Sequence, residues 1–264
     1  MRSVAKCEKL WPAVALLIFL NGCGSGNNRV LEEVSEKIYP VNPRANINIH
    51  NHDGAILVYG SDVNEVRVRS LKRAYSHERL SQLVIDVSAK PEAISITAKA
   101  PHQQKWAFSD HSGTVDCTIV VPATASISAL DLTAGEILLD SMRGPIVHAR
   151  LNDGRIFVRN CFTNLDLTLD RGTLALSYEW WEKEKFSAQA TMIQGNAWLW
   201  LPSEAAFHLL ARAVHGKIAN DFNNQPVSAH SSGGEMNQII NGGGSTTINV
   251  RVQKGNIKIA EANP

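Results

Sequence analysis

A short pattern built on glycine recurs through the middle of the chain and constrains the fold more than any other feature. A glycine, one variable residue and a short apolar run with an aliphatic residue two places after the glycine begin at Gly135, Gly144, Gly154 and Gly172. Gly135, Gly154 and Gly172 are 19 and 18 residues apart. At about 3.3 Å per residue this spacing accommodates one strand, a corner, a second strand and a return. Such a period indicates a chain wound into coils that stack on one another.

The pattern continues toward the C-terminus with small changes. Asn164 takes the place of the glycine in one coil, because Asn, like Gly, tolerates positive φ. Gly195, Gly216 and Gly255 follow at steps of 23, 21 and 39 residues, and the last step fits two coils. We therefore predict an all-β fold over residues 46–262: a single-stranded β-solenoid, a β-helix-like stack of short Gly-x-Ile strands.

The glycines also predict which side chains face the core. Side chains alternate across a strand, so residues two and four places after each glycine should point inward. The first set is Ile137, Ile146, Ile156, Leu165, Leu174, Ala197, Ile218 and Ile257, and the second is Leu139, His148, Val158, Leu176, Leu199 and Ile259. Stacked coils would align like positions about 4.8 Å apart in aliphatic ladders.

The N-terminus carries the features of an export signal. Arg2, Lys6 and Lys9 precede an apolar run from Leu10 to Leu20 that is too short to span a bilayer as a helix. The run ends in Leu-Asn-Gly-Cys at Cys23, which resembles the bacterial lipobox. We predict a signal peptide over residues 1–22.

Lipidation of Cys23 is the expected consequence of this motif. Several acyl chains on one Cys hold a protein firmly at a membrane, whereas a single chain binds marginally. Gly24 follows the Cys, and by resemblance to lipoprotein sorting in double-membrane bacteria this predicts an outer-membrane protein facing the periplasm. The alternative is ordinary cleavage near Gly22 to Gly26 with an incidental Cys.

Residues 23–45 are predicted to be a lipid-anchored tether. Gly24 to Asn28 is rich in Gly, Ser and Asn, which favours flexibility, and residues 30–38 are expected to form a short helix against the body. A second short helix is expected at residues 76–83, with Ser76 as its N-cap.

Two long stretches resemble a known family. "INIHNHDGAILVYGSDVNEVRVRSLKRA", followed by a short helix and a strand pair, and "VVPATASISALDLTAGEILLDSMRGPI" are similar to the bacterial putative adhesin family of β-strand-repeat domains, over roughly residues 46–260. The resemblance implies a β-repeat fold that is often carried by lipoproteins. It implies no catalytic residues and no cofactor, and the name of the family is itself an inference from shape.

Charge and cysteine content limit the remaining classes. Cleavage before Cys23 leaves a net charge of −1 without a basic stripe, which argues against nucleic acid as a partner. Cys117 and Cys161 are 44 residues apart, about two coils. Strands two layers apart are too distant for a disulfide, so two separate buried thiols are expected.

Two groups of polar residues suggest chemistry, each with a simpler alternative. His50, His52 and Asp53 have a spacing seen in metal sites, but Asp53 before Gly54 also fits a turn, which we favour; no metal is expected. Asp53, Asp153 and Asp170 lie just before glycines, as the paired carboxylates of a solenoid carbohydrate enzyme could, but Asp is favoured there for backbone reasons.

Trp198 and Trp200 are the candidate ligand-binding residues. With Ala197 and Leu199 facing inward, both indoles face outward and would form a flat platform for a sugar ring or a partner protein. The neighbours expected in adjacent coils are Ala175 and Ser177 on one side and Ala219 and Asp221 on the other.

Other parts of the chain could cover or enlarge this platform. Residues 181–194 or the tether would cover the indoles if either folded over them. Tyr178, Trp180 and Trp181 would extend the platform if the strand continued that far. Of these outcomes we favour coverage of the indoles, because large aromatic side chains are buried on average.

These observations favour a non-enzymatic cell-envelope lipoprotein whose adhesin-like domain binds a glycan or an envelope protein, or acts as a scaffold. The alternatives are a solenoid carbohydrate-active enzyme and an envelope scaffold that assembles with copies of itself through open coil edges.

Overall fold

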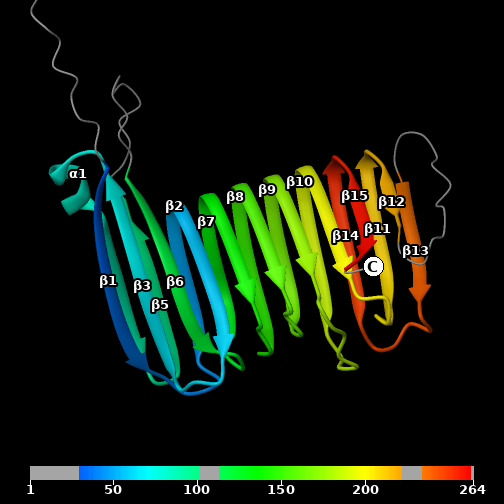
Figure 1. Ribbon diagram of the computed structural model, residues 1–264, viewed down its shortest axis with the longest axis horizontal. Helices are drawn as coiled ribbons and strands as arrows, with labels where there is room; N and C mark the ends of the chain where they lie inside the picture. The colour runs from blue at the N-terminus through cyan, green and yellow to red at the C-terminus, as the bar shows by residue number, and fades with distance from the viewer. Residues whose placement is uncertain (1–29, 101–112, 222–233, 263–264) are drawn as a thin grey trace, which may run out of the picture.

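The computed structural model describes residues 30–100, 113–221 and 234–262. Within these ranges the chain forms one mixed sheet of fifteen strands and a single helix, α1 (His77–Gln82), as Figure 1 shows. The all-β prediction is confirmed. α1 is the one helix of the described residues, and with six residues it is far too short to cross a bilayer.

The strands follow one another along the long axis of the molecule (Figure 1). The N-terminal part contains β1 (Leu31–Pro40), β2 (Asn46–Ser61), β3 (Glu65–Ala74), β4 (Val84–Lys90), β5 (Ala93–Lys99) and β6 (Thr114–Pro122). Four long strands make the middle: β7 (Ser126–Asp140), β8 (Ile146–Arg159), β9 (Asn164–Ser177) and β10 (Ser187–Leu201). The C-terminal part contains β11 (Phe207–His215), β12 (Ile218–Asn220), β13 (Gly234–Ile240), β14 (Thr247–Lys254) and β15 (Ile257–Glu261).

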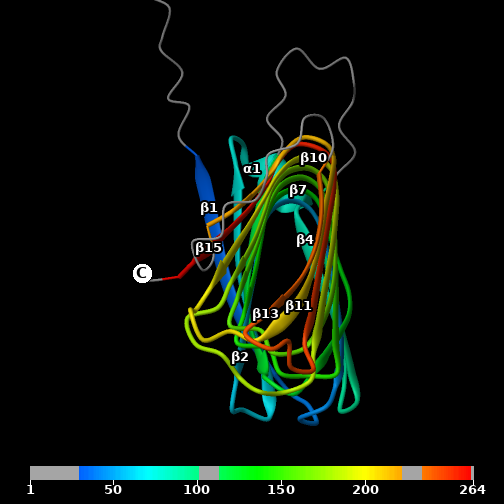
Figure 2. The ribbon, with the colours of Figure 1, turned by 90° about the vertical axis from the view of Figure 1, so that its right-hand side faces the viewer.

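The middle strands are parallel, and their glycines are in register. Gly54, Gly135, Gly154, Gly172 and Gly195 lie side by side in β2 and β7 to β10, with φ between 121° and 137°. Each strand continues through its glycine and bends there, so that in the end-on view the chain outlines a flattened ring (Figure 2). At these five glycines the prediction of short strands that start at turn glycines is therefore wrong, since the strands are long and the glycines lie inside them. At Gly216 and Gly255 it is confirmed, because the short strands β12 and β15 begin two residues later.

The core ladders mostly follow the predicted register. Ile137, Ile156, Leu165, Leu174, Ala197 and Ile257, and also Leu139, Val158, Leu176, Leu199 and Ile259, are buried. Ile218 is only half-buried.

The register predicted for one coil is wrong, because Gly144 is not a glycine of the column. Gly144 lies in the connection between β7 and β8, outside the glycine column, where it packs against the backbone of Ala125. Ile146 and His148 consequently face outward, and their neighbours Val147 and Ala149 fill the core. Asn164 likewise does not replace a column glycine, because it begins β9 and pairs with Ile146.

The predicted helix at residues 30–38 is wrong. Residues 31–38 belong to β1, which pairs antiparallel with β3. Glu32 and Glu33 form ion pairs with Arg73 and Lys72 across the two strands. The apolar spacing of this segment resembles that of a helix, but pairing with β3 prevails. Much of the predicted tether is therefore part of the sheet, whereas the other domain boundaries remain predictions.

The short helix after β3 is confirmed. Ser76 is the N-cap of α1, and its Oγ accepts a hydrogen bond from the backbone N–H of Arg79 at 3.1 Å. Leu80 packs into the core from this helix.

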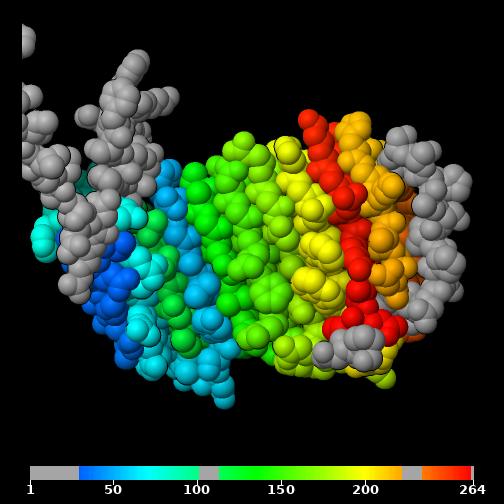
Figure 3. Space-filling model, turned by 45° about the horizontal axis from the view of Figure 1, so that its top comes forward, coloured from blue at the N-terminus to red at the C-terminus, as the bar shows by residue number. Residues whose placement is uncertain are grey.

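The C-terminal segment departs from simple sequential order. β14 lies between β10 and β11, and β15 lies between β10 and β12. Figure 3 shows this segment, in red, between the yellow and orange strands. β14 and β15, from the end of the chain, thus lie next to β10. This placement changes the neighbours of Trp198 and Trp200.

Candidate functional site

The predicted lipidation residue, Cys23, lies outside the described residues, as does the predicted signal peptide. The structure therefore does not bear on the anchor, which stays a prediction.

Trp198 and Trp200 lie on β10 and point away from the core. Ala197 and Leu199 alternate with them and are buried, while both indoles are partly exposed. The centroids of the two indoles are 5.8 Å apart and their planes are 17° from parallel. This is offset stacking, so each ring covers part of the other and the exposed aromatic surface is narrower than two rings lying side by side.

The neighbours of the tryptophan pair agree with the prediction on one side only. Trp198 and Trp200 pair with Ala175 and Ser177 of β9. On the other side they pair with Lys258 and Ala260 of β15.

Ala219 and Asp221, the predicted neighbours on that side, lie one strand farther away because β15 intervenes. The structure thus places a cation beside the indoles. The Lys258 Nζ lies 5.8 Å from the centroid of the Trp198 ring and 3.2 Å from a carboxylate oxygen of Asp221.

An apolar row on the outward-facing side of the sheet leads to Trp198, and Ala175 within this row is buried. Leu57, Leu138, Phe157, Ala175 and Trp198 are register partners on β2 and β7 to β10. Each is the third residue after a column glycine, so the alternation that turns Trp198 outward predicts the same direction for the other four. Trp198 therefore ends an apolar row that runs across five strands.

The other aromatic residues do not enlarge the tryptophan platform. β9 ends at Ser177, and Tyr178 is fully buried, with its OH donating to the carbonyl of Cys161 at 3.1 Å. Tyr178 and Trp181 pack with Phe162, Phe186 and Phe207 in a cluster.

Trp180 is 41% exposed but stands against Phe162, and its Nε1 donates to Glu182. No ring contact joins these aromatic residues to Trp198 or Trp200 among the described residues.

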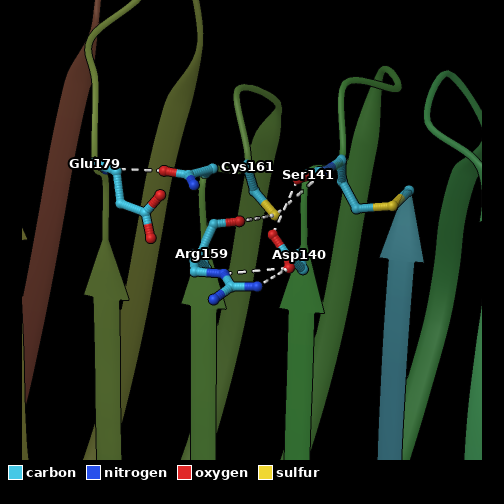
Figure 4. A network of polar contacts seen from close by, with 7 residues as sticks. Asp140, Ser141, Arg159, Cys161 and Glu179 are labelled. Carbon is cyan, nitrogen blue, oxygen red and sulfur yellow. Dashed lines mark hydrogen bonds and ion pairs between the residues drawn. The ribbon is translucent and has the colours of Figure 1, made fainter. Parts of the chain in front are cut away.

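A polar network fixes the strand ends beside the tryptophans. The Nε of Arg159 donates to Asp140 at 3.2 Å, and the Ser141 Oγ donates to the same carboxylate at 3.0 Å. The backbone N–H of Glu179 donates to the side-chain oxygen of Asn160 at 2.8 Å. As Figure 4 shows, these contacts join the ends of neighbouring strands. The network thus ties the ends of β7 and β8 to the segment that follows β9, and β9 pairs with Trp200 through Ser177.

The two described cysteines are separate and buried, as predicted. Burial raises the pKa of the Cys117 thiol and of the Cys161 thiol to about 12. The Cys161 Sγ donates to the Arg159 carbonyl at 3.3 Å. Neither thiol is placed for nucleophilic chemistry, because the reactive thiolate is strongly disfavoured.

The strand segments before the glycines carry a different, polar surface. The Nδ1 of His50 lies 3.0 Å from an Asp131 carboxylate oxygen, and the Nδ1 of His148 lies 3.2 Å from an Asp166 carboxylate oxygen. Arg150 lies between these two pairs, next to Asp131 in the register of β7 and β8. The sequence draws attention to His50 through its spacing from His52, but no local pattern predicts the contact of His50 with Asp131, 81 residues later.

His50 and His52, the two histidines of the metal alternative, contact different residues in the structure. The Nδ1 of His52 lies 3.1 Å from the Thr133 hydroxyl, and His50 contacts Asp131. Among the residues that the structure describes, no three His, Cys, Asp or Glu side chains gather as metal ligands.

Asp153, one of the glycine-adjacent carboxylates, is held by an arginine. Arg171 donates two hydrogen bonds to Asp153, at 2.6 and 2.7 Å, and these bonds lower the pKa of the Asp153 carboxyl. Carbohydrate hydrolysis needs one carboxyl group whose pKa is raised. The two hydrogen bonds from Arg171 lower the pKa of Asp153 and therefore oppose that role.

Comparison with known proteins gives only distant matches. No family model and no curated protein matches this chain. Among solved structures, a putative cell adhesion protein from Clostridium sporogenes is 15% identical, with a TM-score of 0.49 over 87% of this chain and 100% of that chain.

A putative adhesin from Bacteroides fragilis is 10% identical, with a TM-score of 0.29 over 87% of this chain and 97% of that chain. A putative lipid binding protein from Parabacteroides distasonis is also 10% identical, with a TM-score of 0.30 over 88% and 97%. Similarities at this level assign neither an activity nor a ligand to this chain.

Proposed function

We propose that this chain is a non-enzymatic, adhesin-like binding protein of the cell envelope, built as a β-solenoid and held by lipid at Cys23. The glycine column and the parallel register support the solenoid description, because each bent strand adds one layer to its neighbour. The protein acts by display. The lipid anchor and the short segment before β1 hold a solenoid that presents its outer surface to a ligand.

The stacked pair of Trp198 and Trp200 is the observation that carries this proposal. Two indoles, partly exposed on a rigid strand, offer π-faces on which a sugar ring can stack. Lys258 adds a donor at the edge of the same surface, within reach of a ring hydroxyl. The apolar row through Phe157 and Leu138 extends the contact area for a ligand longer than one sugar.

A glycan array tests the proposal. The wild-type protein is compared with the double variant Trp198→Ala/Trp200→Ala and with Trp180→Ala, which removes an exposed indole elsewhere. The proposal expects that the double variant loses the neutral glycans bound by the wild type, whereas Trp180→Ala retains them. Equal binding of neutral glycans by the wild type and the double variant would dismiss the platform.

Self-assembly is a second candidate, favoured by the ends of the sheet. β1 and β13 are the two ends of the strand order, and among the described residues each pairs on one side only. Val34 on β1 is 57% exposed and Ile239 on β13 is 63% exposed. Open edges with exposed apolar residues favour pairing with another chain. Light scattering distinguishes the candidates, since a strictly monomeric profile would exclude assembly.

A further inference from the structure

The polar surface around Arg150 carries a site separate from the tryptophan platform. His50, Asp131, Arg150, Thr168 and Thr191 are register partners on β2, β7, β8, β9 and β10. They belong to the strand segments before the column glycines, whereas Trp198 and Trp200 follow the glycine of β10. The row therefore lies on the other side of the bend from the indoles.

Arg150 is the residue that sets this surface apart. It forms no ion pair and no side-chain hydrogen bond among the described residues, although it is exposed beside Asp131. Other arginines of β8 and β9 are engaged: Arg155 pairs with Glu136, Arg159 with Asp140 and Arg171 with Asp153. The donors of the Arg150 guanidinium are thus free for a ligand.

Asp131, the carboxylate beside Arg150, contacts a histidine. Asp131 contacts His50 at 3.0 Å, and Asp166 in the next row contacts His148 at 3.2 Å. Both carboxylates are about half exposed, so their remaining oxygen lone pairs are open to hydroxyl donors. The surface therefore offers one free cation flanked by acceptors.

Two hollows meet at Arg150 and Asp131. The larger, of about 460 Å³, is also lined by His50, His52, Thr133 and Asn152. The smaller, of about 160 Å³, is lined by Ser128, His148, Asp166 and Thr168. Ligand sites commonly have volumes of about 300–1,000 Å³, which the larger hollow alone satisfies.

A β-bulge shapes the smaller hollow. The register of β7 shifts against β2 after Ile47 and against β8 between Ile127 and Leu130. Ser128 is the extra residue, and its hydroxyl donates to the side-chain oxygen of Asn46. Bulges of this kind redirect side chains and are frequent beside functional sites.

We propose that this surface binds a sugar acid, with Arg150 holding its carboxylate. A guanidinium matches a carboxylate with two parallel hydrogen bonds. Asp131, Asp166, Thr133 and Asn152 then hydrogen-bond the hydroxyls of the same or the neighbouring sugar. The ligand class is a uronic acid residue within a glycan.

The flanking charges favour this class over other anions. Asp131 and Asp166 lie close to Arg150 and repel a doubly charged phosphate more strongly than a singly charged carboxylate. His, Asp, Thr and Asn side chains surround the cation, and the apolar residues of the lining are small or buried, which suits a ligand rich in hydroxyls and not an acyl chain. The inference goes beyond the tryptophan platform and does not depend on it.

Calorimetric titration of the full-length protein tests the proposal. The probes are tetramers of galacturonate, of mannuronate and of a glucuronate-containing glycan, each beside its neutral counterpart. We expect at least one uronate to bind at least about tenfold more tightly than its neutral counterpart, and Arg150→Ala to abolish that preference. Arg155→Ala, on the same strand but past the bend, and Trp198→Ala/Trp200→Ala should both retain it.

Three outcomes would overturn the site. The first is that no uronate binds more tightly than its neutral counterpart. The second is that Arg150→Ala, folded with wild-type circular dichroism, binds uronate like the wild type. The third is that inorganic phosphate competes as strongly as the uronate. Loss of uronate binding in the tryptophan variant alone would assign the ligand to the platform instead.

Discussion

The carbonyl oxygen of Gly135 lies where a side chain on Gly154 would begin. A Cβ built on Gly154 would be 1.8 Å from that oxygen, and Gly154 itself has φ of +137°. A Cβ built on Gly172 would likewise be 1.8 Å from the carbonyl oxygen of Gly154, and one built on Gly195 would be 1.8 Å from that of Gly172. Successive strands approach so closely at the bend that only glycine fits, for reasons of space as well as conformation.

Gly154→Ala should therefore be strongly destabilising. The clash is with backbone and cannot be relieved by a rotamer, so we expect unfolding to be easier by about 3 kcal/mol or more. Gly242→Ala is the matched control, because Gly242 also has positive φ, +80°, but nothing lies within 4 Å of its Cβ.

The control should lose about 1–2 kcal/mol from backbone strain alone. Urea denaturation measures both variants. Equal losses would contradict the close approach of the glycine column.

The corrected register of β8 gives a second prediction. Val147 is buried and Ile146 is partly exposed, whereas the glycine pattern alone predicts the reverse. Val147→Asp buries an unpaired charge and should cost at least about 4 kcal/mol or prevent folding. Ile146→Asp should stay within about 1 kcal/mol of the wild type. Thermal unfolding compares the stability of the two variants. A greater loss of stability in Ile146→Asp than in Val147→Asp would support the register predicted from Gly144.

The buried thiols should resist labelling. Burial raises the pKa of Cys117 and of Cys161 to about 12, so a folded chain that starts at Gly24 should react with a thiol reagent at pH 8 only through unfolding. Arg155→Cys adds an exposed thiol on β8 as the control and should react at once. Rapid modification of two thiols in the folded wild type would contradict their burial.

The same pKa values predict a loss of stability in alkali. The thiols ionise near pH 9.0 when unfolded and near pH 12 when folded. The unfolded chain therefore releases these protons first, and the unfolding free energy should fall as the pH rises from about 9 toward 12. Below pH 9 the two thiols should have no effect on it. Replacing both by Ala should flatten that part of the pH profile.

The anchor has its own test. Cys23→Ser removes the acceptor of the acyl chains, so the protein should move from the membrane fraction to the soluble fraction while retaining its circular dichroism spectrum. Asn21→Ala, which brings the motif closer to a common lipobox, should leave the protein in the membrane fraction. Retention of Cys23→Ser at the membrane would exclude lipidation at this residue.

The sequence predicts the layered β architecture because glycine has a geometric task at each bend. Ile137, Ile156 and Leu174 align as expected, since their spacing from a column glycine fixes their side of the strand. Gly144 has the same local pattern but a different task, close packing against Ala125, and sequence spacing does not distinguish the two. The segment from Leu31 to Pro40 forms a strand only because β3 offers an open edge.

The functional surfaces were predictable to different degrees. The outward direction of Trp198 and Trp200 follows from alternation, but Lys258 stands beside them only because the C-terminal segment inserts next to β10. The meeting of His50, Asp131 and Arg150 depends on the register of three strands and on the bulge at Ser128. Such lateral neighbours are set by pairing between distant segments, which local patterns do not contain.

The most direct test of the binding function is the affinity of the purified protein for the strongest neutral glycan found on the array, measured by calorimetry. We expect Trp198→Ala/Trp200→Ala to weaken binding at least about tenfold and Trp180→Ala to leave it unchanged. Wild-type affinity in the double variant, with its fold intact, would contradict this expectation.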